Sequence, residues 1–127
     1  MQWMFGNEPA FDQDLSKWNV DKVTDMRWMF SDATAFNGDL SKWNAGQVVD
    51  MGRMFYGAKS FNQDLSNWNV VTVTDMESMF AGAIAFNGDV SKWNVCVCAR
   101  ARACVCVRAC VCVCVCVCVH VRMCVCV

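Results

Sequence analysis

The stretch Leu15-Ser16-Lys17-Trp18-Asn19-Val20 returns three more times along the chain, each time 25 residues further on. The tryptophans of the four copies fall at positions 18, 43, 68 and 93, and phenylalanine and aspartate positions keep the same step. A fixed period of this length indicates a solenoid, in which each unit buries its apolar face only against its neighbours.

The first half of each unit is predicted to contain a short strand. Leu15, Trp18 and Val20 follow the rhythm of a leucine-rich repeat, with tryptophan in one leucine position. Around Trp18 and Val20 the apolar period is two residues, so both side chains are expected to point inward while Lys17 and Asn19 face solvent. Strands of successive units would then form a narrow parallel sheet.

Residues 24–33 are predicted to form a short helix. Their apolar side chains recur at the spacing of one helical face: Met26, Met29, Phe30 and Ala33. Thr24 is suited to cap this helix, and Asp25 suits the positive end of its dipole. The predicted fold is therefore an α/β solenoid, a leucine-rich-repeat-like stack of four 25-residue units, each with a short parallel strand and a short helix.

Composition divides the chain of 127 residues at position 95. Residues 1–95 hold all 12 Asp and Glu and 7 of the 11 Lys and Arg, whereas residues 96–127 hold all 11 cysteines and no acid. We interpret residues 1–95 as the solenoid. Residues 96–127 are a low-complexity Val-Cys tail, expected to be irregular or β-prone and typical of a translated dinucleotide repeat.

Several classes of function are disfavoured by the sequence. The acidic repeat part has no cluster of Lys and Arg, which argues against nucleic acid binding. The longest arginine-free run of the tail, residues 109–121, is shorter than the roughly 20 residues that a membrane-spanning helix needs. The only histidine is His120, so the recurring Asp-Leu-Ser has no base for a catalytic triad. We predict no enzymatic activity, no cofactor and no metal site in the repeats, and interpret their Asn-x-Asp turns as backbone caps rather than calcium ligands.

The pattern Thr-Asp-Met-x-x-Met-Phe-x-x-Ala-x-x-Phe-Asn-x-Asp-Leu-Ser-x-Trp-Asn-Val, read from residues 24–45 and 74–95, resembles a known family. It is similar to the repeat of BspA-like leucine-rich-repeat surface proteins, a mycoplasma-type domain of unknown function. The resemblance covers residues 1–95 and implies a secreted or cell-surface protein that binds protein or another cell-surface macromolecule. It implies no catalytic residues, and no signal peptide is recognised at the start of this chain.

The copies differ mainly at positions that should face solvent, such as 17, 21 and their copies, and these positions together with the outward-facing asparagines beside them define a candidate protein-binding face. Its members are Lys17, Asn19, Asp21, Lys42, Asn44, Asn67, Asn69, Lys92 and Asn94. Trp3 and Trp28 lie between the core positions of the expected helices, so they too are expected at the surface. An alternative function places the activity in the tail, because cysteine thiolates bind zinc or copper(I).

Overall fold

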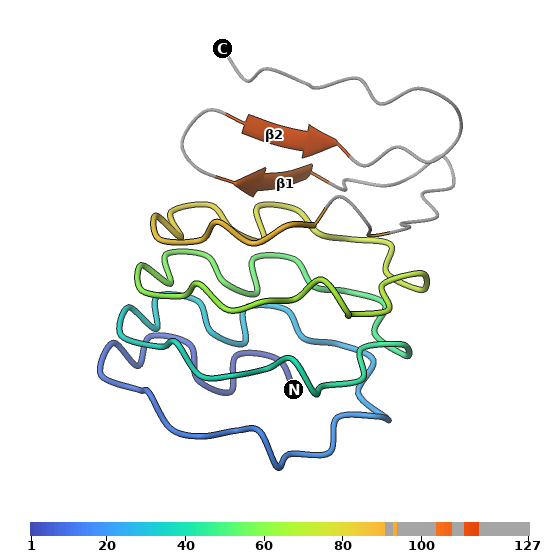
Figure 1. Cartoon of the computed structure of the whole chain (residues 1–127), viewed down its shortest axis with the longest axis horizontal. Coiled ribbons are helices and arrows are strands. Elements are labelled where there is room, and N and C mark those ends of the chain that lie inside the picture. The colour runs from blue at the N-terminus through green and yellow to red at the C-terminus, as the bar shows by residue number, and fades with distance from the viewer. Residues whose placement is uncertain (91–92, 94–103, 108–110, 115–127) are drawn as a thin grey trace.

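The repeats form a stack of coils in the computed structural model, which describes residues 1–90, 93, 104–107 and 111–114 (Figure 1). Isolated parallel bridges join Asp25 to Asp50 and Asp50 to Asp75, so equivalent residues of successive coils lie beside one another. Two regular strands follow in the tail, β1 (Cys104–Val107) and β2 (Val111–Cys114). They pair antiparallel, with Cys104 opposite Cys114.

The predicted α/β solenoid of strand-and-helix units is wrong. The described residues contain no helix, and within residues 1–90 the only β-pairing is the two isolated bridges. In the expected helix, the amides of residues 29, 31 and 33 donate to carbonyl groups three residues back, but those of residues 26, 28, 30 and 32 donate to the next coil. An α-helix directs its amides to carbonyl groups four residues back. The coil-to-coil bonds therefore replace the helix with a run of tight turns.

Two positions in each coil hold these turns in the left-handed region of backbone space. One position is occupied by residues with φ from 57 to 76°: Asn7, Asp32, Gly57 and Gly82. Gly, Asn and Asp reach positive φ more easily than other residues, so the composition of this position is a turn signal. The other position has φ from 54 to 61° and carries Trp3, Trp28, Arg53 and Ser78. These residue types carry no such signal.

The strand expected around Trp18 and Val20 is absent as well. The Trp18 amide donates to the Leu15 carbonyl (3.0 Å), and the Oδ1 atom of Asn19 accepts the Asp21 amide (2.9 Å). Side-chain caps of this kind offer the backbone an alternative to pairing with a neighbouring strand. This part of the coil is consequently built from turns.

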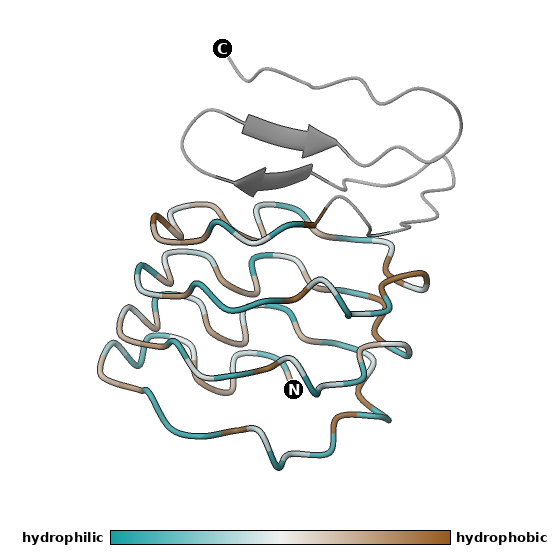
Figure 2. Ribbon diagram, in the orientation of Figure 1, coloured by the Kyte–Doolittle hydropathy of each residue, from teal (hydrophilic) through white to brown (hydrophobic). Residues whose placement is uncertain are grey.

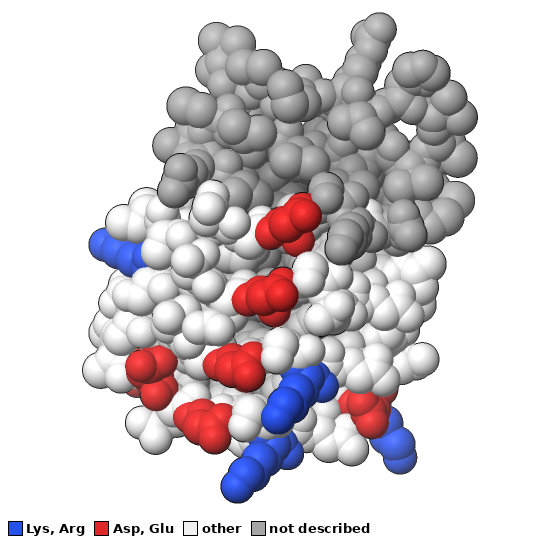
Figure 3. All heavy atoms as spheres, in the orientation of Figure 1, with Lys and Arg blue, Asp and Glu red and all other residues white. Residues whose placement is uncertain are grey.

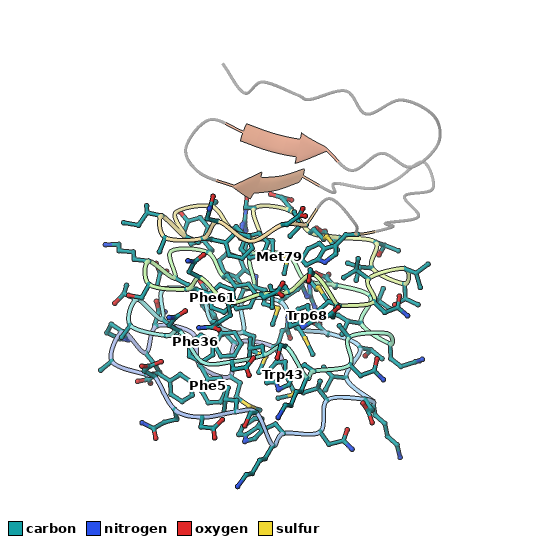
Figure 4. All side chains as sticks on the ribbon, viewed as in Figure 1. Phe5, Phe36, Trp43, Phe61, Trp68 and Met79 are labelled. Carbon is teal, nitrogen blue, oxygen red and sulfur yellow. The ribbon has the colours of Figure 1, made fainter. Side chains whose placement is uncertain are left out.

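The apolar positions of the repeat nevertheless form the core. Met26, Met29, Phe30 and Ala33 are fully buried, as their spacing predicts, although their backbone is not helical. Phenylalanine rings stack from coil to coil, with centroids 5.5 Å apart for Phe30 and Phe55. Figure 2 shows hydrophobic and hydrophilic positions alternating along each coil, and Figure 4 shows the labelled phenylalanine and tryptophan side chains inside the stack.

A second buried column consists of tryptophans. The indole N–H of Trp43 donates to the Leu15 carbonyl (3.1 Å), and that of Trp68 donates to the Leu40 carbonyl (3.0 Å). Both side chains are at most 4% exposed, whereas Trp18 is 41% exposed. The expected burial of Trp18 is therefore wrong, although its ring lies 5.5 Å from that of Phe5, as the Trp43 ring lies 6.2 Å from that of Phe30. Trp18 lies in the first coil, where no described coil covers its outer side.

Candidate functional site

The candidate binding face lies at the surface wherever the structure describes it. The exposed members are Lys17, Asn19, Asp21, Lys42, Asn44, Asn67 and Asn69. Lys92 and Asn94 fall outside the described residues. The expected exposure is thus met at the seven described positions, and binding by this face stays a prediction.

The asparagines of this face also hold the backbone. The Oδ1 atoms of Asn19, Asn44 and Asn69 each accept the amide two residues further on, at 2.9, 3.1 and 3.2 Å. An asparagine in this arrangement closes an Asx turn. Sequence reasoning treated these residues as binding residues alone, and their recurrence in every copy is the signal that could have shown the structural role.

Lysines of this face lie close to a column of aspartates. Asp14 accepts the Ser16 amide, and this hydrogen bond lowers the pKa of the carboxyl, with further lowering from Lys17 and Lys42. The pKa of Asp39 is lowered in the same way, and Lys42 again contributes. Lys42 is therefore close to aspartates of two coils. Figure 3 shows a column of acidic side chains crossing the coils, with basic side chains at its lower end.

A second polar and aromatic surface was not assigned from the sequence. We call Trp3, Trp28 and Arg53 the aromatic–arginine column, because they occupy equivalent positions of three successive coils. The rings of Trp3 and Trp28 meet edge to face with centroids 5.2 Å apart, and the Arg53 guanidinium lies 4.6 Å from the Trp28 centroid. Arg53 also pairs with Glu77 at 3.1 Å. The sequence signal for this surface was the variation of the residue type at this outward position, which reads Trp, Trp, Arg and Ser at 3, 28, 53 and 78.

Carboxylates line up next to this column. Asp25, Asp50 and Asp75 occupy equivalent positions, and Arg27 joins the first two. Its Nη2 atom lies 2.7 Å from Asp25 Oδ2, and its Nε atom lies 3.4 Å from Asp50 Oδ2. A shallow pocket of about 170 Å³ opens here, lined by Arg27, Trp28, Asp50, Gly52, Arg53, Asp75 and Glu77. Three carboxylates and two guanidinium groups therefore share one small surface.

The carboxylates of this row differ in proton affinity. The hydrogen bond from the Arg27 guanidinium lowers the pKa of Asp25. Burial raises the pKa of Asp50, and the negative charges of Asp75 and Asp25 add to that rise. At Asp50, burial and the negative charges of Asp25 and Asp75 therefore outweigh the positive charge of Arg27.

Asp50→Asn is expected to make the folded state more stable at neutral pH. The folded-state pKa of Asp50 is raised, so ionisation of this carboxyl above that pKa weakens the folded state. Asparagine keeps an Oδ1 atom for the Gly52 amide, which lies 2.9 Å from Asp50 Oδ1. The gain should fade as the pH falls through the raised folded-state pKa and be absent well below the ordinary value of 3.8, where the wild-type carboxyl is protonated in both states. Urea denaturation at neutral and acidic pH measures both effects.

Asp25→Asn is the matched control, with the opposite expected sign. The pKa of Asp25 is lowered in the folded state, so its carboxylate stabilises the fold above 3.8 and loses this effect as the pH falls through the folded-state pKa. Asp25→Asn should therefore destabilise the protein at neutral pH. A loss of stability in both variants would contradict the assignment for Asp50.

The described residues contain no group of three or more His, Cys, Asp or Glu side chains arranged to hold a metal ion. The cysteines of the alternative zinc or copper(I) proposal lie in the tail, where the structure describes no side chains. Within the described ranges, no helix is long and apolar enough to cross a membrane.

Comparison with known families identifies the repeat. The family described as "Mycoplasma protein of unknown function, DUF285" matches residues 1–105, which is most of the chain. No curated protein and no solved structure matches the sequence. The chain therefore belongs to the DUF285 family of mycoplasma-type proteins of unknown function.

Proposed function

We propose that this chain is a non-enzymatic repeat scaffold that binds protein, or another macromolecule, at a cell surface in the manner of BspA-like repeats. One observation carries the proposal: core positions stay constant from coil to coil while the exposed positions beside them change. Positions 17, 42 and 67 read Lys, Lys and Asn, and all three are exposed.

The arrangement supports binding over an extended surface. Stacking places Lys17 and Lys42 on neighbouring coils, each near an aspartate that also faces solvent. Charged groups at the edge of an interface steer encounter and fix its register, even where they add little affinity. A partner whose acidic groups match the spacing of Lys17 and Lys42 would therefore be selected by this face.

The double variant Lys17→Glu, Lys42→Glu is expected to lose the partner. The probe is a cell-surface protein extract passed over the immobilised full-length chain at low salt, with retained proteins compared between variants. Charge reversal places like charges opposite the partner, which typically reduces the association rate and strengthens salt sensitivity. We expect the retained amount of at least one protein to fall about tenfold, corresponding to a loss of about 1.4 kcal/mol in binding free energy.

Lys22→Glu, Lys59→Glu is the matched control, because both lysines are exposed and the net charge changes equally. A protein lost from the first variant and kept by the control supports the face. Equal retention by both variants and the wild type would place binding elsewhere.

A further inference from the structure

The aromatic–arginine column displays large rings outside the core. Trp3 is 49% exposed and Trp28 is partly exposed, whereas Trp43, Trp68 and Trp93 are buried. A pocket of about 400 Å³ adjoins both rings, lined by Gln2, Trp3 and Trp28. Trp28 also lines the smaller carboxylate pocket, so the two hollows flank one indole ring.

Tryptophan at positions 3 and 28 adopts a backbone conformation that bulky residues disfavour. Trp3 and Trp28 have φ of 61 and 58°, a region that bulky residues rarely adopt, and glycine would occupy it without strain. Their side chains do not belong to the buried core. Core packing therefore does not explain the choice of tryptophan at these two positions.

Within the column, the Trp28 indole already contacts a guanidinium group. The Arg53 guanidinium lies 4.6 Å from the Trp28 centroid, within the range of a cation–π contact. Arginine combines stacking on an aromatic ring with paired hydrogen bonds to a carboxylate. Trp28 and its surrounding carboxylates offer both partners on one surface.

The charge around the column is also complementary to a cation. Asp50, Asp75 and Glu77 line the pocket beside Trp28 together with Arg27 and Arg53. Asp25 adds a fourth carboxylate, paired with Arg27. Residues 1–95 as a whole hold 12 acidic against 7 basic side chains. An approaching basic segment therefore meets a net negative surface.

We propose that the aromatic–arginine column binds an arginine-bearing basic peptide segment of a partner protein, with a guanidinium group seated in the pocket lined by Gln2, Trp3 and Trp28. The Gln2 side chain lines that pocket and carries an amide oxygen that can accept from the guanidinium. The neighbouring carboxylates hold the remaining positive charge of the segment. This surface shares no residue with the candidate binding face, so it is a second contact site.

The test measures binding of a labelled peptide of alternating glycine and arginine to the full-length chain under reducing conditions, by fluorescence anisotropy. Trp3→Gly and Trp28→Gly should each weaken binding about two- to fivefold, the size of an exposed cation–π contact. Glycine suits the positive φ, so these variants should remain folded. Ser78→Gly is the matched control, because Ser78 has φ of 54° at the equivalent position and no ring.

Two further measurements sharpen the result. The same peptide with lysine in place of arginine should bind more weakly, because lysine lacks the planar group that stacks. Affinity for the arginine peptide should fall with rising salt. Equal binding by Trp3→Gly, Trp28→Gly and the wild type would overturn the proposal. Binding of a neutral oligosaccharide in place of the arginine peptide would overturn it as well.

Discussion

Trp68→Ala is expected to lower the free energy of unfolding by about 3–5 kcal/mol, a large share of the total stability of a domain of this size. Trp68 is 4% exposed, and its ring stacks on Trp43 with centroids 6.4 Å apart. Truncation leaves a cavity between the coils. It also removes the indole N–H that reaches the Leu40 carbonyl at 3.0 Å, leaving that buried acceptor without this donor. Urea denaturation followed by circular dichroism measures the change.

Two companion variants separate the causes. Trp68→Phe keeps a ring but removes the N–H donor, so it should fall between Trp68→Ala and the wild type. Trp3→Ala should change stability little, because Trp3 is 49% exposed and lies outside the core. If Trp68→Ala proved as mild as Trp3→Ala, the tryptophan column could not be a main source of stability.

The period of 25 residues predicted which side chains are buried but not how the backbone carries them. Met26, Met29, Phe30 and Ala33 have helical spacing and are all buried, yet the chain reaches this arrangement through turns. A helix of so few residues is marginal on its own. Here the amides of alternate residues find carbonyl partners in the next coil, and this tertiary pairing outweighs local helix formation.

The left-handed turn positions show where a local signal was present and where it was absent. Asn7, Asp32 and Gly57 share one position and together indicate positive φ. Trp28 and Arg53 share the other left-handed position, and neither residue type predicts it. Neighbouring coils impose that conformation, so it depends on contacts between residues 25 positions apart in the sequence.

Of the two candidate surfaces, one could be predicted from the sequence and the other could not. Exposure of Lys17 and Lys42 followed from variation between copies, which needs only the repeat register. The aromatic–arginine column depends on the stacking of Trp3, Trp28 and Arg53 from three coils. Such a site arises from the way the coils stack, and no single copy of the repeat contains it.

Phe55→Ala is expected to cost about 3–5 kcal/mol, because Phe55 joins two stacked columns of rings. Its ring centroid lies 4.0 Å from that of Phe61 in its own coil, and 5.5 Å from those of Phe30 and Phe80 in the neighbouring coils. The side chain is fully buried. Removing this ring therefore weakens contacts on both sides of one coil, and urea denaturation should show the loss directly.

Phe5→Ala tests the same substitution in the first coil. Phe5 is only partly buried and packs against the edge of the core, stacking on Phe11 and Phe30. In a repeat stack, stability resides mainly in the interfaces between neighbours. Phe5→Ala should therefore cost less than Phe55→Ala, and hydrogen exchange should be slower at the Phe55 amide than at the Phe5 amide in the wild type. Equal losses and equal protection at the two positions would show that the first coil is as firmly held as the interior ones.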